Sequence, residues 1–173
     1  FGTEEQSGGL QDLEHMEYFL TKIKQIGENN NLVMPTYIVL QTGTKVKEME
    51  NVGIYQNFDT FCVDEFKDTI IGIEQIHSYG FKVKEHNTDY LSSDALALRP
   101  LLGIDASNIA PEFGVIETKT ILQMFKYFNR TDLIDRFIEL SFQSKKWEKW
   151  MKTNDHHNYS GIYLGIIAGH YNF

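Results

Sequence analysis

Four short polar clusters carry the side chains in this sequence that could do chemistry, and each stands where an apolar run stops. They are Gly2-Thr3-Glu4-Glu5, Gln41-Thr42-Gly43-Thr44-Lys45, Lys84-Glu85-His86-Asn87-Thr88-Asp89 and Asp105-Ala106-Ser107-Asn108. Their carboxylate, amide and imidazole groups could bind a divalent metal such as zinc, manganese or magnesium, or transfer a proton. Each cluster precedes a stretch that reads as helix, and a (β/α) barrel builds its active site in this way on one face.

The spacing of apolar residues predicts helices and strands that alternate around these clusters. We expect helices at 10–26, 61–78, 94–98, 114–128 and 131–140, and strands at 37–40, 81–86 and 101–104. The run at 37–40 is continuously β-branched and aromatic, which is typical of a strand covered on both faces. Pro100 is expected to stop the helix that begins at Asp94.

Side chains in the strand expected at 81–86 alternate between two faces. The apolar residues fall on one face, and Lys82, Lys84 and His86 fall on the other. We expect the apolar face to meet helices and the other face to line the lumen of a barrel.

The composition excludes several classes of partner. A formal net charge of −8, with 42% hydrophobic residues, argues for a globular protein that does not bind nucleic acid. No apolar stretch reaches the roughly 18 to 20 residues of a membrane span, so no membrane partner is expected. The single cysteine, Cys62, cannot form an internal disulfide, which favours a reducing compartment and a cytoplasmic protein.

We expect a single domain over residues 1–173, with βα units over 1–140 and an aromatic tail over 141–173. If a further strand ends at Phe1, there are about four βα units, half of the eight that close a barrel. Half a barrel leaves two sheet edges open, which is a liability in an isolated chain. The chain is therefore expected to be the carboxyl half of a larger protein, or a half that closes by association.

Three of the clusters together resemble a known family. Gly2-Thr3-Glu4, Val39-Leu40-Gln41-Thr42-Gly43 and Glu85-His86-Asn87-Thr88-Asp89-Tyr90 follow the order and similar spacing of the non-catalytic Z-type subunit of class II tagatose-bisphosphate aldolase. The resemblance implies an α/β fold of the (β/α)8 TIM-barrel type, in which this chain would supply strands five to eight. It covers most of residues 1–128 and is weaker near 105–113, so the chain resembles a divergent branch.

Aldol cleavage, the reaction that the resemblance suggests, needs a polarised ketose carbonyl and a base that takes the hydroxyl proton. Glu4, Glu5, His86 and Asp105 are the candidate catalytic residues, and His86, Glu5 and Asp105 are also the candidate metal ligands. His86 could equally be an oriented structural histidine, and the two glutamates could form a solvated turn. A lysine imine at the strand 81–86 is a further, weaker alternative.

Seven residues are candidates for binding the sugar phosphate: Gln41, Thr42, Gly43, Lys45, Asn87, Asp89 and Asn108. Lys45 follows a loop of small residues, whose backbone N–H groups can approach an anion. Asp89 could instead cap the segment that follows it. Asn108 is expected to contact a sugar hydroxyl.

Three functions remain open at this point. The chain could be a carbohydrate-metabolism protein of the tagatose-bisphosphate aldolase type, a lyase acting on a ketose phosphate. It could instead be a non-catalytic subunit that stabilises an aldolase complex, with an aldolase catalytic subunit or a second copy as partner. A metal-dependent sugar epimerase or isomerase on the same scaffold is the third function. The tail, with Trp147 and Trp150, could stack on sugars, but such tails more often pack as a lid or subunit contact.

Overall fold

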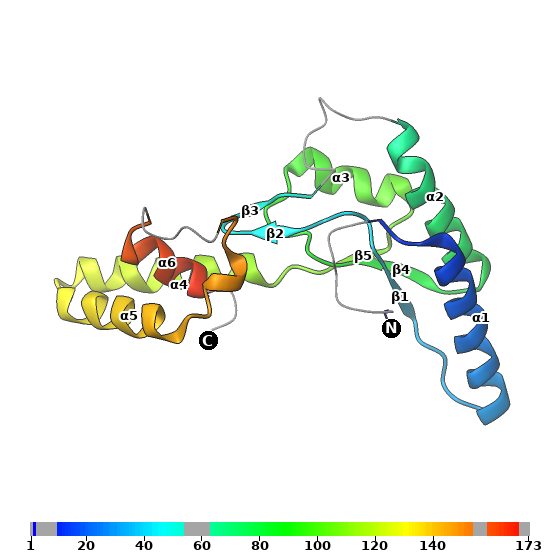
Figure 1. The fold of residues 1–173 in the computed structure, drawn as a ribbon, viewed down its shortest axis with the longest axis horizontal. Coiled ribbons are helices and arrows are strands. Elements are labelled where there is room, and N and C mark those ends of the chain that lie inside the picture. The colour runs from blue at the N-terminus through cyan, green and yellow to red at the C-terminus, as the bar shows by residue number, and fades with distance from the viewer. Residues whose placement is uncertain (1, 3–9, 54–62, 154–158, 170–173) are drawn as a thin grey trace. The chain divides into compact units, whose positions relative to one another are not determined.

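The computed structural model describes residues 2, 10–53, 63–153 and 159–169, and Figure 1 shows its ribbon. The chain divides into two compact units. Unit 1 comprises Phe1–Lys45 and Asn51–Asn108, and unit 2 comprises Val46–Glu50 and Ile109–Phe173. The boundary expected at residue 140 falls inside a helix, α5 (Thr131–Ser144), and the expectation of one domain stays a prediction.

Unit 1 contains a parallel sheet whose strands are β1 (Tyr37–Leu40), β4 (Lys82–Glu85) and β5 (Ala106–Ser107), in that order. The register pairs Tyr37 with Lys82 and Lys84 with Ala106. Helices α1 (Leu13–Asn30), α2 (Val63–Ser78) and α3 (Ser93–Leu102) precede or connect these strands. The strand predicted at 37–40 is confirmed, and the one predicted at 81–86 is confirmed with slightly shorter bounds.

The core of unit 1 lies between one face of this sheet and helices α1 and α2. It is built from Met16 and Leu20 of α1, Ile38 and Leu40 of β1, Ile73 and Ile76 of α2, and Phe81, Val83 and Ile104. The alternation predicted for β4 is confirmed, because Val83 is fully buried while Lys82 is exposed. Within the described residues the sheet is open at β1 and β5, so closure into a barrel stays a prediction.

The predictions around Pro100 are wrong. Helix α3 continues through Pro100 to Leu102, and Gly103 ends it with a left-handed backbone (φ 92°). Residues 101 and 102 are therefore helical, and the next strand is β5, which begins only at Ala106. Pro100 lies in the last turn of the helix, and the Gly103 N–H donates to the carbonyls of Arg99 and Pro100 where the helix ends.

The other predicted helices are present with somewhat different bounds: α1 lies further along the chain than predicted, and α5 continues to Ser144. Helix α1 begins after the Asp12 side chain, which accepts a hydrogen bond from the His15 N–H, and ends at the left-handed Asn31. Helix α4 (Pro111–Tyr127) starts three residues earlier than predicted, with a proline in its first turn. None of the helices in the described part of the chain is both long and apolar enough to cross a bilayer.

Unit 2 is mainly helical. Helices α4 and α5 pack with α6 (Gly161–Ala168). The short 3-10 helix η2 (Glu148–Trp150) lies between α5 and α6 in sequence. Strands β2 (Val46–Lys47) and β3 (Glu50–Asn51) form a two-stranded sheet, and the turn between them belongs to unit 2. Trp147, Met151, Leu164, Ile167 and Ala168 form the core of this unit, with Met49 and Trp150 packed against it.

Candidate functional site

Buried polar side chains gather where the strands of unit 1 end. Gln41 and Thr42 follow β1, Glu85 is the last residue of β4, and Thr88 and Asp89 lie in the loop after β4; all are less than 5% exposed. Because β1 and β4 are parallel neighbours, their carboxyl ends lie at the same edge of the sheet. Burying a polar side chain costs free energy unless the side chain is hydrogen bonded or paired. A cluster of several buried polar side chains is therefore a candidate functional site.

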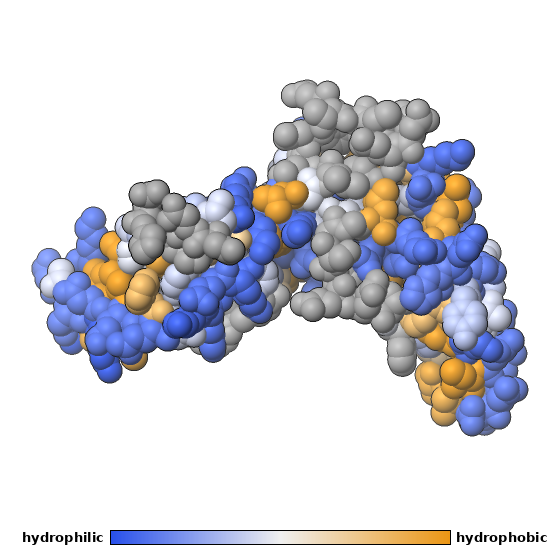
Figure 2. All heavy atoms as spheres, in the orientation of Figure 1, coloured by the Kyte–Doolittle hydropathy of each residue, from blue (hydrophilic) through white to orange (hydrophobic). Residues whose placement is uncertain are grey.

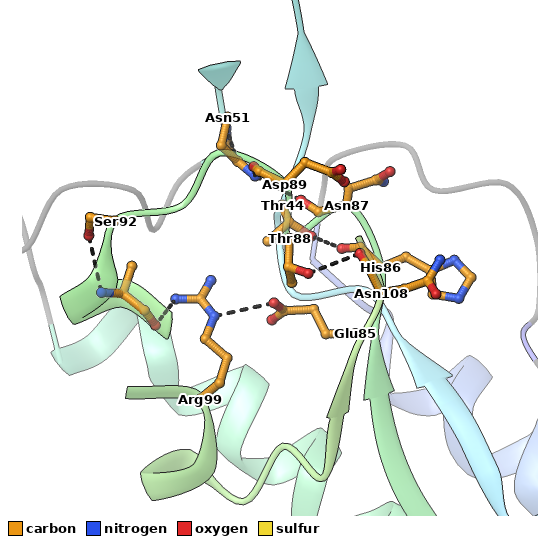
Figure 3. Close-up of polar contacts among 12 residues, drawn as sticks. Thr44, Asn51, Glu85, His86, Asn87, Thr88, Asp89, Ser92, Arg99 and Asn108 are labelled. Atoms are coloured by element: carbon orange, nitrogen blue, oxygen red, sulfur yellow. Dashed lines mark hydrogen bonds and ion pairs between the residues drawn. The ribbon is translucent and has the colours of Figure 1, made fainter. Parts of the chain in front are cut away.

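Glu85 and Arg99 form a buried ion pair at this edge. The Arg99 Nε donates to Glu85 Oε1 at 3.2 Å, and the two side chains are 4% and 1% exposed. Arg99 Nη1 also donates to the Ala95 carbonyl at 2.8 Å, which holds the guanidinium along α3. Figure 3 shows Glu85 directed toward Arg99, while His86 is directed away from this pair.

The Glu85 carboxylate is costly to ionise in this position. Burial raises its pKa above the ordinary value, and the charge of Arg99 and the Thr42 hydroxyl only partly offset that effect. The attraction between the two charges offsets the cost of burying them, and removal of either partner would leave an unpaired buried charge. Neither Glu85 nor Arg99 was predicted as a site residue.

Asn51 fixes the loop that follows β4. Its Nδ2 donates to the carbonyls of Asn87 at 2.7 Å and Asp89 at 3.1 Å. Its Oδ1 accepts from the N–H groups of Lys45 at 3.3 Å and Gly53 at 3.1 Å. The side chain is 1% exposed, so one buried amide connects three segments of unit 1 through all of its polar atoms.

Two further hydrogen bonds hold the same loop, as Figure 3 shows. The Thr44 hydroxyl donates to the His86 carbonyl at 2.6 Å, and the Thr88 hydroxyl donates to the Asn108 carbonyl at 2.9 Å. Asn87 and Tyr90 both have positive φ angles, 57° and 60°. Non-glycine residues in this region are held there by their surroundings and cluster at functional sites.

His86 lies at the carboxyl end of β4 and is half-buried. Burial lowers its pKa below the ordinary histidine value, and the positive charge of Lys84 lowers it further. The neutral imidazole is therefore favoured near pH 7, and it could accept a proton or bind a metal.

Asp105 does not join His86. It precedes β5, and its Oδ2 accepts a hydrogen bond from the Val83 N–H at 2.8 Å and contacts His77 Nε2 at 3.0 Å. Although burial alone raises the pKa of Asp105, the His77 and Val83 contacts lower it below the ordinary value. Because helix α3 extends to Leu102, the strand begins later than predicted and Asp105 falls at its amino end.

The other candidate residues fall into three groups. Glu4 and Glu5 lie outside the described residues. Gln41, Thr42, Asn87 and Asp89 lie at the carboxyl edge, and Asn108 meets the loop through its backbone carbonyl. Gly43 has a φ of 82°, which glycine adopts without strain, and Lys45 is exposed. In the described part of the chain, no three His, Cys, Asp or Glu side chains are grouped so that they could hold a metal.

A second polar cluster lies in unit 2, around Glu48. The buried carboxylate accepts hydrogen bonds from the hydroxyls of Tyr159 at 3.1 Å and Tyr163 at 2.9 Å and from the Lys152 N–H at 3.2 Å. Burial alone raises the pKa of Glu48, but these hydrogen bonds lower it below the ordinary value. Burial and the bond to Glu48 raise the pKa of Tyr163. Because these groups are hydrogen bonded to one another, we interpret this cluster as stabilising unit 2 and not as a binding site.

The aromatic tail packs within unit 2. Trp147 is buried, and its ring stacks on Phe142 with centroids 5.6 Å apart. Tyr159 and Tyr163 also stack, with centroids 5.2 Å apart.

Sequence reasoning missed Glu85, Arg99, Asn51 and Thr44. A signal for Arg99 existed in the sequence. Arg99 lies four residues after Ala95, on the same side of a short apolar helix, and an arginine is almost never buried without a partner. Asn51 gave no such signal, since the carbonyls to which its Nδ2 donates lie more than thirty residues away in the sequence.

The fold and the site together define unit 1 as a set of parallel βα units with polar groups at the carboxyl ends of the strands. No protein family matches the chain. No curated protein and no solved structure matches it either.

Proposed function

We propose that this protein is a carbohydrate-metabolism protein of the tagatose-bisphosphate aldolase type, which binds a ketose phosphate at the carboxyl ends of β1 and β4. The observation that carries the proposal is the group of buried polar side chains at those strand ends. In (β/α) folds, ligands bind at this edge because the loops that follow the strands converge there. A cytoplasmic location is part of the proposal and follows from the single cysteine.

The sheet order supports a barrel of the aldolase type. Strands β1, β4 and β5 are sequential parallel neighbours, and the core side chains from α1 and α2 meet one face. Consecutive βα units arranged in this way are the building pattern of a (β/α)8 barrel, in which this chain would supply strands five to eight. The opposite face, with Lys84 and His86, would then line the lumen.

His86 is the residue best suited to contact the substrate. Its neutral imidazole could accept the hydroxyl proton of a ketose phosphate, and Asn87, which is half-buried, could bind a sugar hydroxyl. Of the predicted metal ligands, Glu5 lies outside the described residues, and Asp105 lies at the amino end of β5 and not beside His86. No step of the proposal is therefore routed through a divalent metal.

A non-catalytic role beside an aldolase partner is the second candidate. It is favoured by the contacts of the acidic groups. Glu85 is paired with Arg99, and Asp105 contacts His77 and Val83, so both carboxylates already have partners within the protein. Such a subunit would bind the sugar phosphate or stabilise the complex without turning substrate over.

Calorimetric titration with tagatose 1,6-bisphosphate tests the proposed site. We expect His86→Ala to weaken binding by about tenfold, the loss of roughly one hydrogen bond to a charged group. His77→Ala is the matched control, because that histidine contacts Asp105 at the other end of the sheet. Equal effects of the two variants, or no binding by the unaltered protein, would contradict the proposal.

Activity measurements separate the candidate functions. An aldolase releases a triose phosphate from the sugar, an epimerase exchanges solvent deuterium into it without release, and a non-catalytic subunit does neither. Elemental analysis of the protein purified without chelator checks for bound zinc, manganese or magnesium. About one metal per chain that is lost in His86→Ala would favour catalysis.

A further inference from the structure

Helix α4 is apolar on two opposite sides. One side faces the interior of unit 2 with Val115 and Leu122, which are buried. The other side carries large apolar residues that are between 52% and 81% exposed: Phe113, Ile116, Met124 and Tyr127. Figure 2 shows hydrophobic surface on the helices of unit 2. An ordinary surface helix has one apolar side, so the second one needs an explanation.

The exposed residues form a single line along α4. Their positions, with Thr120 between Ile116 and Met124, are separated by three, four, four and three residues, which keeps them on one side of a helix. We call this line the α4 stripe. It is symmetric in sequence about Thr120, with Phe113 and Tyr127 equally far from it and Ile116 and Met124 likewise.

We propose that the α4 stripe is the contact surface of a homodimer, in which two copies of α4 cross antiparallel about a two-fold axis near Thr120. The axis places Phe113 on Tyr127 of the second copy and Ile116 on Met124 of the second copy. A two-fold contact needs a surface complementary to itself, and the symmetry of the stripe about its centre meets that requirement.

The charges beside the stripe favour the antiparallel direction. Glu112 lies at the amino end of α4 and Lys126 at its carboxyl end, fourteen residues apart on the same flank of the stripe. Antiparallel helices bring Glu112 of each copy opposite Lys126 of the second copy. In a parallel two-fold pair this flank of the two copies would lie on opposite sides of the contact, and the two charges would not meet. Antiparallel helix dipoles add to this preference.

The stripe is large enough for a dimer. Phe128 extends it, with its ring edge-on to Tyr127 and the centroids 5.1 Å apart. If each large side chain exposes roughly 200 Å² when free, the five residues offer about 600 Å² per copy at their observed exposures. A stable interface buries roughly 800 Å² per partner, and the flanks of the helix would supply the difference.

Sedimentation analysis over a range of protein concentrations tests the proposal. The unaltered chain should be dimeric, and Ile116→Glu should weaken association at least about 100-fold because it buries an unpaired charge from each copy. Leu140→Glu is the matched control, since it introduces the same charge at a similarly exposed apolar residue of α5. A chain that stays monomeric, or a dimer that Leu140→Glu weakens as much as Ile116→Glu does, would overturn the proposal.

Charge-exchange variants and engineered cysteines test the direction of the helices without disturbing the apolar surface. Glu112→Lys and Lys126→Glu should each weaken association, and the double variant should restore it. Thr120→Cys, in a Cys62→Ser background, should form a disulfide between copies under mild oxidation, while Lys119→Cys should cross-link less. A dimer in which the double variant is weaker than either single variant would rule out the antiparallel arrangement. These outcomes do not depend on whether the sugar-phosphate proposal holds.

Discussion

The Glu85 carboxylate depends on Arg99 to remain charged inside unit 1. Arg99→Met should lower the free energy of unfolding at neutral pH by about 3–5 kcal/mol, because it leaves a buried carboxylate without its partner. Denaturant unfolding measures the change. Arg136→Met is the control, since Arg136 pairs with Glu139 at an exposed site, and it should cost less than about 1 kcal/mol. Similar losses in the two variants would contradict a special role for the buried pair.

The loss of stability in Arg99→Met should also depend on pH. Burial already raises the pKa of Glu85, and removal of Arg99 should raise it further. A carboxyl group with a raised folded-state pKa favours folding at low pH, and this contribution is lost as the pH rises through that pKa. The stability deficit of Arg99→Met should therefore shrink as the pH falls toward ordinary carboxyl values. A deficit that is constant with pH would show that lost packing, and not charge, is the cause.

His86 should titrate below the ordinary histidine value, as burial and Lys84 together require. Chemical-shift titration of its ring protons measures this pKa directly. Lys84→Met should raise the pKa of His86 toward the ordinary value of about 6.5. Lys22→Met, on the exposed side of α1, should leave it unchanged. If Lys84→Met had no effect, burial alone would account for the lowered pKa.

At the scale of elements, the loop after β4 owes its shape to a side chain from outside it. Asn51→Ala should lower the free energy of unfolding by about 2–4 kcal/mol, because the carbonyls of Asn87 and Asp89 lose a buried donor. Hydrogen exchange should rise at residues 86–91 more than in α1. Asn30→Ala, which removes an exposed side-chain bond to the Ile26 carbonyl, is the control and should change stability by less than about 1 kcal/mol. Unchanged exchange in the loop would contradict this role for Asn51.

The turn between β2 and β3 is fixed by a carboxylate with a lowered pKa, that of Glu48. Such a group stabilises the folded state above its unfolded-state pKa, and the contribution is lost as the pH falls through its folded-state pKa. Glu48→Gln should therefore lower stability at pH 7 and make unfolding less sensitive to acid below about pH 4.5. Thermal unfolding at a series of pH values measures both effects. Equal acid sensitivity in the two proteins would show that other carboxylates dominate.

At the scale of the whole molecule, the chain passes between its two units at three points. Residues 46–50 belong to unit 2 although the segments on either side belong to unit 1. A fragment of residues 109–173 would thus lack Glu48, the acceptor of the Tyr159 and Tyr163 hydroxyls. We expect this fragment to unfold at a lower temperature than unit 2 does in the full chain, as measured by circular dichroism. A fragment that melts as the full chain does would show that unit 2 does not need the turn.

Much of unit 1 was predictable from the sequence. The spacing of apolar residues in α1, α2, β1 and β4 reports which side of each element is buried, and that periodicity depends only on local backbone geometry. The position of the polar clusters after β1 and β4 followed from the same reasoning. The prediction failed after Pro100, where a glycine cap and the end of α3 outweighed the usual effect of proline.

The sequence by itself determined helices α1, α2, α4 and α5, strands β1 and β4, the alternation of β4, and the polar composition at the ends of β1 and β4. Only the tertiary structure decided which polar groups meet. Glu85 lies on the buried face of β4 and finds Arg99 on α3, while Asp105 turns to His77 and Val83. The periodicity of apolar residues depends only on residues that are close in sequence. A contact between distant side chains also depends on where each helix ends and on the register in which the strands pair.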